Sequence, residues 1–147
     1  MDKLVIRDMG EEDILEVVNI EQVSFSTPWS EQSFLRELYR KYSIMKVAVF
    51  RDKIIGYICA DYKFHEACIL NLAVHPDYRR RGVATILMNN VINELKNRGC
   101  VFLYLKVRFS NTGAKEFYKR FGFKTESIRK KYYSNPDEDA LVMMGRL

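Results

Sequence analysis

Three consecutive arginines, Arg79–Arg81, stand directly before Gly82 at the start of a segment with helical periodicity. Gly82 and the small residue Ala84 leave the backbone N–H groups of a helix start uncrowded. Those N–H groups carry the positive end of the helix dipole, and arginines add charge-assisted hydrogen bonds to anions. The pattern therefore predicts a site for a phosphate or pyrophosphate, with a solvated helix cap as the alternative.

A second pattern lies downstream, where Asn111 is followed at fixed spacing by Ala114, Tyr118 and Gly122-Phe123. Asparagine is a common helix N-cap, and Tyr118 falls on the apolar face of the helix that follows. Spacing alone makes Asn111 a cap and Tyr118 a core residue. Taken with the arginine–glycine segment, the two patterns favour binding of a nucleotide-derived cofactor.

The composition is ordinary for a globular protein, with 147 residues, 48% of them hydrophobic and 29% charged, and a net charge of +5. This length predicts one domain over residues 1–147. Neither a membrane-spanning apolar run nor a secretory signal is recognisable, so we expect a cytoplasmic protein. Positive residues are dispersed except at Arg79–Arg81 and Arg129–Lys131. That distribution fits an anionic cofactor, and direct nucleic-acid binding is not expected.

The cysteines and histidines do not indicate a metal site. Cys59, Cys68 and Cys100 are odd in number and match no zinc-binding spacing. Cys59 and Cys68 lie in apolar strand-like runs, which predicts buried free thiols in a reducing compartment. His65 and His75 fall in a connecting loop and a turn, where we expect surface residues and not catalytic bases.

Apolar periodicity alternates between that of strands and that of helices, which predicts a mixed α/β fold. Pro76 ends one strand, Ser30 can cap a helix, and Gly99 can end another. The expected strands cover residues 3–7, 44–50, 54–62, 67–74, 101–107, 123–129 and 140–147, with a connection over 130–139. The expected helices cover residues 11–23, 30–39, 82–98 and 111–121.

In the order of its elements and in its motifs, the chain resembles the GNAT superfamily of N-acetyltransferases over essentially its whole length. The superfamily motif Arg/Gln-x-x-Gly-x-Gly/Ala is matched by Arg79, Gly82 and Ala84, and a second motif runs from Asn111 to Phe123. The subfamily that it resembles best is that of the RimI-type ribosomal-protein-alanine and related N-terminal acetyltransferases. The residues that carry this likeness lie in Phe25–Ser30, Asn71–Tyr78, Leu105–Asn111, Tyr132-Tyr133 and Asp139-Ala140.

The resemblance implies a single α/β domain with the GNAT fold. Its central sheet is mostly antiparallel, is splayed at the fourth and fifth strands, and is flanked by helices. It also implies acetyl-CoA (coenzyme A) as the cofactor, with the pantetheine arm on the backbone of Leu72–Val74 and the pyrophosphate on the amides of residues 80–85. The cofactor-binding residues expected on this basis are Leu72, Ala73, Val74, Arg79, Arg80, Arg81, Gly82, Val83, Ala84, Thr85 and Asn111.

The same resemblance implies roles in catalysis and in acceptor binding. Tyr118 would lie near the thioester sulfur as the general acid for the departing thiolate, and a backbone N–H near Leu72 or Ala73 would donate to the thioester oxygen. A protein or peptide N-terminus is the implied acceptor. The residues expected to line its groove are Phe25, Trp29, Tyr132 and Tyr133, although the two tyrosines are also typical aromatics of a strand edge.

One residue departs from the resemblance. RimI-type enzymes usually carry a glutamate, their usual proton acceptor, where this chain has Lys106. A protonated lysine cannot accept a proton, so the role of the base is not transferred to it. Deprotonation through water, helped by Glu21 or Glu66, is one alternative. Lys106 itself could attract an acidic second residue of the peptide or pair with an internal carboxylate.

The missing base favours an α-amine as the acceptor. With a pKa of about 7.8, an α-amine is roughly 14% neutral at pH 7, whereas a lysine amine is only about 0.04% neutral. We therefore expect an Nα-acetyltransferase. The alternatives are an acetyltransferase for lysine or small amines, and a catalytically weak acyl-CoA-binding module.

Overall fold

The computed structural model describes residues 3–147, whose seven strands form one sheet in the order β1-β2-β3-β4-β5-β7-β6. Neighbouring strands are antiparallel except β4 and β5, which are parallel. The mostly antiparallel mixed sheet expected from the sequence is confirmed. The strands are β1 (Leu4–Asp8), β2 (Ser43–Phe50), β3 (Lys53–Lys63), β4 (Glu66–Val74), β5 (Phe102–Arg108), β6 (Lys124–Tyr133) and β7 (Glu138–Arg146).

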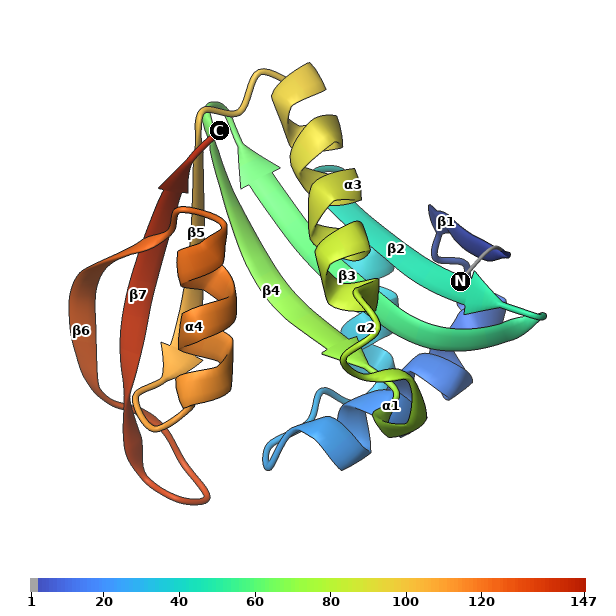
Figure 1. The fold of residues 1–147 in the computed structure, drawn as a ribbon, viewed down its shortest axis with the longest axis horizontal. Helices are drawn as coiled ribbons and strands as arrows, with labels where there is room; N and C mark the ends of the chain where they lie inside the picture. Colours follow the sequence, from blue (N-terminus) through green and yellow to red (C-terminus); the bar gives the residue numbers. More distant parts are fainter. Residues whose placement is uncertain (1–2) are drawn as a thin grey trace.

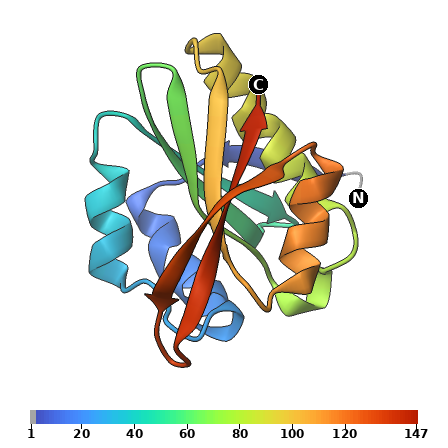
Figure 2. The same ribbon diagram turned by 90° about the vertical axis from the view of Figure 1, so that its left-hand side faces the viewer.

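Four α-helices cover the two faces of the sheet. Helices α1 and α2 lie on one face and α3 and α4 on the other, as the views of Figures 1 and 2 agree. No helix in the described residues is long and apolar enough to cross a membrane. The helices are α1 (Ile14–Ser24), α2 (Glu31–Leu38), α3 (Val83–Asn97) and α4 (Thr112–Arg120), with 3-10 turns η1 (Glu11–Asp13) and η2 (Pro76–Tyr78).

The sheet separates two layers of core. Beneath α3, a stripe of residues at helical spacing packs on the strands, because positions four apart lie on one face of a helix. Beneath α1 and α2, Phe34 meets Tyr57 edge to face with ring centroids 5.8 Å apart. The buried stripe of α3 consists of Val83, Leu87, Val91 and Leu95.

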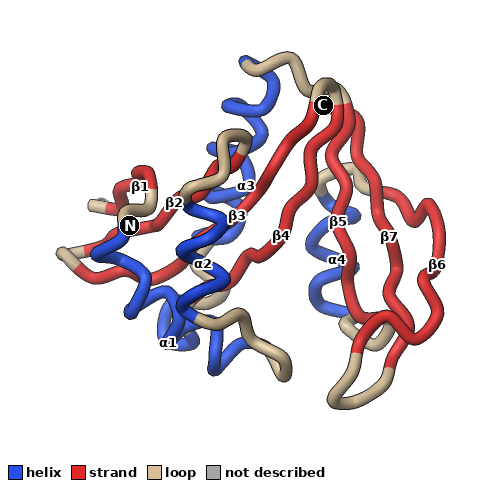
Figure 3. Tube along the Cα trace, turned by 180° about the vertical axis from the view of Figure 1, so that it is seen from behind, coloured by secondary structure: helices blue, strands red, loops and turns tan. Residues whose placement is uncertain are grey.

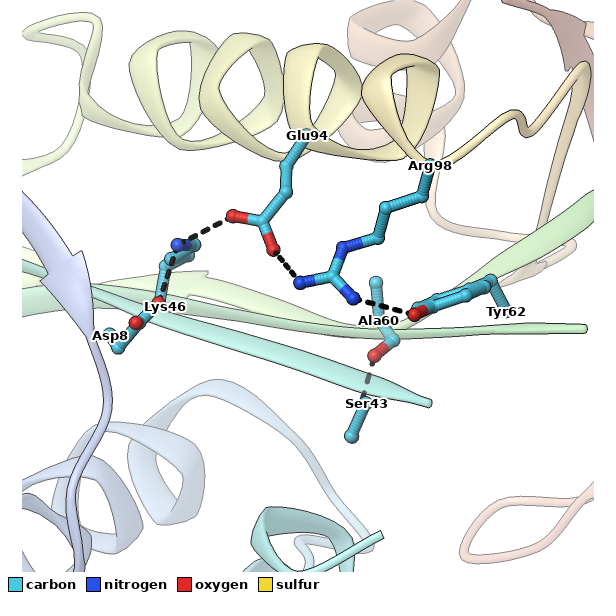
Figure 4. Close-up of polar contacts among 7 residues, drawn as sticks. All are labelled: Asp8, Ser43, Lys46, Ala60, Tyr62, Glu94 and Arg98. Atoms are coloured by element: carbon cyan, nitrogen blue, oxygen red, sulfur yellow. Dashed lines mark hydrogen bonds and ion pairs between the residues drawn. The ribbon is translucent and has the colours of Figure 1, made fainter. Parts of the chain in front are cut away.

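Helix α3 lies close to the sheet at one end and is held by charges at the other. A Cβ atom at Gly56 would meet the Ala73 carbonyl oxygen at 3.1 Å, so a small residue is required where α3 crosses. Figure 4 shows the polar contacts toward the helix C-terminus, where Glu94 pairs with both Lys46 at 2.8 Å and Arg98 at 3.0 Å. These contacts fix α3 against β2 and β3.

Strands β4 and β5 pair over a short length and then separate. Only Glu66–Cys68 of β4 is in register with β5, and Leu70 is an extra residue opposite β3, where Asn71 pairs with Cys59 and Ile69 with Ala60. Such a bulge bends its strand. Beyond it the two strands diverge, as Figure 3 shows, which confirms the expected splay.

Two local expectations, the end of β6 and the burial of Cys68, differ from the structure. Strand β6 continues to Tyr133, where the sequence analysis ended it at residue 129, because the Lys131 N–H donates to the Asp139 Oδ1 at 2.8 Å and anchors a bulge. Cys68 is half-buried, since it lies beside the point where β4 leaves β5. In α4 only Tyr118 is fully buried, because the helix covers the end of the sheet.

Candidate active site

A cavity of about 250 Å³ occupies the place where β4 and β5 separate. Its walls come from both faces of the sheet, since α1 and the loop after it contribute on one side and α4 on the other. The cavity therefore reaches through the sheet. Its lining residues are Glu21, Phe25, Ser26, Thr27, Trp29, Ile69, Leu70, Asn71, Leu72, Leu105, Lys106, Val107, Arg108, Asn111, Ala114, Tyr118 and Tyr133.

Six of the residues singled out from the sequence meet in this cavity, although they span more than 100 positions of the chain. They are Phe25, Trp29, Leu72, Asn111, Tyr118 and Tyr133. Tyr132 lies beside it, with its ring centroid 5.6 Å from the Lys106 Nζ. Ala73 and Val74 continue β4 beyond the cavity, and Arg79–Thr85 form the approach to α3 and its first turn.

Tyr118 is 8% exposed and lies in an aromatic group with Phe117 and Phe123, at ring-centroid distances of 5.1 Å and 5.8 Å. Burial, with a smaller contribution from Tyr133, raises the pKa of Tyr118 above that of an ordinary phenol. The phenol therefore keeps its proton at neutral pH, which is the state that a general acid requires.

Asn111 is the N-cap of α4, because its Oδ1 accepts a hydrogen bond from the Ala114 N–H at 3.1 Å. The prediction that Asn111 caps this helix is therefore confirmed. The side-chain amide also lines the cavity, so its N–H groups remain as donors for a ligand. Contact of Asn111 with a cofactor stays a prediction.

Glu21 is a buried carboxylate at the cavity wall, and three donors surround it. The Trp29 N–H donates to Oε2 at 2.9 Å, the Asn71 Nδ2 lies 3.2 Å and 3.1 Å from the two oxygens, and the Tyr57 hydroxyl donates to Oε1. These bonds fix the α1–α2 loop against β3 and β4. The Asn71 Oδ1 is buried without a partner in residues 3–147, so it remains free to accept a ligand N–H.

The other residues considered as bases lie elsewhere. Glu66 stands at the start of β4, in a separate hollow with Asp61 and Tyr104. The His75 Nδ1 accepts a hydrogen bond from the Asp77 N–H at 3.1 Å, and His65 lies in the turn between β3 and β4. None of these groups lines the cavity that holds Tyr118.

Lys106 lines the cavity from β5. The side chains of this strand alternate, with Leu103, Leu105 and Val107 buried and Lys106 half-buried on the opposite face. No carboxylate of residues 3–147 forms an ion pair with it within 4.0 Å. The internal pairing considered for Lys106 is therefore not formed.

Sequence reasoning overlooked Arg108, which joins two loops across the cavity. Its guanidinium donors are shared among groups of the α1–α2 loop and the β6–β7 loop, and it lies 4.6 Å from the Tyr133 ring centroid. The sequence held one signal for Arg108, namely a polar residue at the end of a strand in which buried and more exposed side chains alternate. Its partners are the Ser26 Oγ at 3.0 Å, the Ser134 carbonyl at 2.7 Å, the Pro136 carbonyl at 2.9 Å and the Glu138 Oε1 at 3.3 Å.

The start of α3 has open space in front of its backbone. Gly82 adopts a φ of 81°, and a Cβ there would meet nothing within 4 Å. The Arg79 side chain is already engaged, since Nε donates to the Val74 carbonyl at 2.9 Å and Nη2 to the Ser24 Oγ at 3.2 Å. The groups that remain available for the predicted anion at this end are the backbone N–H groups and the exposed Arg80 and Arg81.

Comparisons with known proteins agree with this fold and site. The model of the acetyltransferase (GNAT) family matches residues 14–123. The [ribosomal protein bS18]-alanine N-acetyltransferase of Salmonella typhimurium is 36% identical over 126 residues, 84% of each chain. A putative enzyme of the same name from Bacillus subtilis is 35% identical over 96% of this chain and 94% of that one.

Among solved structures, the ribosomal-protein-S18-alanine N-acetyltransferase from Escherichia coli superimposes with a TM-score of 0.90 at 31% identity, covering 97% of this chain and 93% of that chain. Ard1 from Thermoplasma volcanium gives 0.90 at 28% identity over 98% and 97%. The fold and the site are therefore those of a class of enzymes, the α/β N-acetyltransferases with a splayed sheet. The chain belongs to the GNAT acetyltransferase family.

Proposed function

We propose that this protein is an acetyl-CoA-dependent Nα-acetyltransferase whose acceptor is the N-terminal amine of a protein, a ribosomal protein in particular. The observation that carries the proposal is the cavity lined from both faces of the sheet. Two substrates can enter it from opposite sides and meet at Tyr118. The names of the bacterial relatives support a ribosomal acceptor, and with it a cytoplasmic location.

The residues present fit acetyl-CoA, which supplies an acetyl group activated as a thioester. Beyond Cys68, β4 has no strand partner on the β5 side, so backbone groups of Leu72–Val74 are available to the pantetheine arm. The open N-terminus of α3 suits the pyrophosphate. An N–H of Leu72 or Ala73 is the donor that we assign to the thioester oxygen.

Transfer is direct in this proposal. The acceptor amine attacks the acetyl carbon, the C–S bond breaks, and the Tyr118 hydroxyl gives its proton to the departing sulfur. The raised pKa of Tyr118 keeps that proton in place until the sulfur becomes basic. An α-amine suits this site better than a lysine amine, because a larger fraction of it is neutral at pH 7.

Glu21 is the residue that we propose receives the amine proton through solvent in the cavity, since it is the only acidic residue among those that line it. E21Q should lower kcat/KM about tenfold or more and alter the acid limb of its pH profile. E66Q is the matched control and should behave as wild type, because Glu66 lies in the separate hollow. If E21Q lowers the rate equally at every pH, Glu21 only positions the α1–α2 loop.

Mass-spectrometric acetylation of a peptide library tests the function. The library contains peptides with free N-termini and matched N-blocked peptides with internal lysines, and purified protein is supplied with acetyl-CoA. We expect modification of free α-amines only. Modification of the blocked lysine peptides would reassign the acceptor class, and tight acetyl-CoA binding without any transfer would support a binding module instead.

A further inference from the structure

We propose that Lys106 selects acceptors with an aspartate or glutamate close to the N-terminus, at the second or third residue. This inference rests on the proposed function, because it concerns the peptide that enters the same cavity. A half-buried ammonium has lost part of its hydration and gains from an anionic partner. Lys106 has no such partner within ion-pair distance in residues 3–147, although it faces the cavity.

Among the other half-buried cations of residues 3–147, Lys46 and Arg108 are paired with carboxylates, whereas Lys115 lies over the Phe109 ring at 5.0 Å and does not line the cavity. Lys46 lies 2.5 Å from the Asp8 carboxylate and 2.8 Å from that of Glu94, and Arg108 shares its donors with Glu138 and with loop carbonyls. For Lys106 only the Tyr132 ring lies above the ammonium, at 5.6 Å. A ring face steadies a cation but leaves room for an anion on its other side.

The charged groups around the cavity leave Lys106 as the lining cation that has no carboxylate partner in residues 3–147. From α1, Glu21 is surrounded by three donors. From β3, Asp61 lies outside ion-pair distance of Lys106, and burial raises the pKa of Asp61 while the charges of Arg40 and Lys106 oppose that rise. Of the two cations that line the cavity, Arg108 is paired with Glu138, so Lys106 is the one left for a carboxylate of the acceptor. An unpaired ammonium attracts an acidic acceptor residue and repels a basic one.

The position of Lys106 limits which acceptor residue it can contact. It lines the same small cavity as Tyr118, where the amine reacts, so only residues next to the amine come within its reach. An extended peptide advances about 3.3 Å per residue, and its side chains alternate in direction. The contact therefore falls on the second or third residue.

The test is kcat/KM of the full chain with acetyl-CoA and peptides that differ only at positions two and three, carrying Asp, Asn or Lys. Wild type should prefer Asp to Asn about tenfold at low salt, and less at high salt because added ions screen the contact. K106M should remove the preference and K106E should reverse it in favour of Lys. K96M, at an exposed lysine of α3, should keep the wild-type ratio.

The outcomes separate this inference from the proposed function. Equal acetylation of the Asp and Asn peptides by wild type, or an Asp preference that survives in both K106M and K106E, overturns the selection by Lys106 and leaves the Nα-acetyltransferase intact. If no peptide with a free N-terminus is acetylated while blocked lysine peptides are, the proposed function fails and this inference fails with it. K106M and K106E replace each other if one of them does not fold, and a wild type without an Asp preference overturns the inference by itself.

Discussion

At the scale of single residues, burial gives Tyr118 and Lys106 opposite properties. The phenol of Tyr118 is neutral, so an apolar aromatic setting holds it in its protonated state. Lys106 is half-buried and has no ion pair in residues 3–147, so an external anion would compensate for its lost hydration. In the proposed mechanism the first group therefore keeps its proton until the leaving sulfur takes it, and in the proposed selection the second binds a substrate side chain.

Replacing Tyr118 tests the general acid. Y118F should lower kcat about a hundredfold or more and leave the acetyl-CoA dissociation constant, measured by calorimetry, within twofold of wild type. Y104F is the control, because Tyr104 lines the other hollow. Since the pKa of Tyr118 is raised, the proton is present up to alkaline pH and wild-type kcat should show no fall from this group below about pH 10. A limb near pH 8 that Y118F removes would contradict this role.

At the scale of elements, Arg108 joins the two loops at the proposed entrance for the acceptor. The α1–α2 and β6–β7 loops are far apart in the sequence, and the guanidinium of Arg108 joins them through Ser26 and Ser134. Glu138, its carboxylate partner, also accepts a hydrogen bond from the Ser110 N–H at 2.5 Å, just before the α4 cap. Hydrogen bonding to Ser110 and the charge of Arg108 lower the pKa of Glu138, so this bridge persists at neutral pH.

Removal of the Arg108 side chain should weaken binding of the acceptor peptide and leave binding of acetyl-CoA unchanged. R108A should raise the peptide KM about tenfold while the acetyl-CoA affinity stays unchanged, because the two loops lie on the side of the cavity that we propose for the peptide. R108K should not restore the KM, since one ammonium cannot replace a planar fork with several donors. R98A, which removes a comparable arginine at the end of α3, is the control. Equal losses for both substrates would show general unfolding instead.

At the scale of the whole molecule, one ion pair fastens the first strand. The buried carboxylate of Asp13 in η1 accepts hydrogen bonds from Nη1 and Nη2 of Arg7, at 2.7 Å and 2.9 Å, and from the Gly10 N–H at 2.8 Å. The hydrogen bond from Arg7 lowers the pKa of Asp13 although burial acts against it. Folding therefore favours the ionised carboxylate, and this contribution is present above the ordinary pKa of Asp and is lost as pH falls through the folded-state value.

D13N should lower the free energy of unfolding by about 1–3 kcal/mol at pH 7. The difference between D13N and wild type should stay constant from about pH 7 to pH 5 and should shrink below about pH 4, where the wild-type carboxylate is protonated too. Urea unfolding at several pH values measures it. A difference that grows on acidification would have the wrong sign for a carboxylate with a lowered pKa.

The sequence by itself determined the local elements and the family. Helices such as α3 and strands such as β5 follow from spacings of a few residues, and the caps at Ser30 and Asn111 form bonds to N–H groups three positions on. These features depend on neighbours along the chain. The motif from Arg79 to Ala84 is equally local, which is why it could be recognised before the fold was known.

Tertiary structure alone decided which residues meet in the cavity. The pairing of β5 with β7, and the bulge at Leu70 that separates β4 from β5, bring Phe25, Tyr118 and Tyr133 together. The same pairings place Glu21 at the cavity and Glu66 outside it, and within the described residues they leave Lys106 without a carboxylate partner. Spacing cannot reveal such contacts, because the distance between residues far apart in the chain is set by strand order and bulges, which no short stretch of sequence encodes.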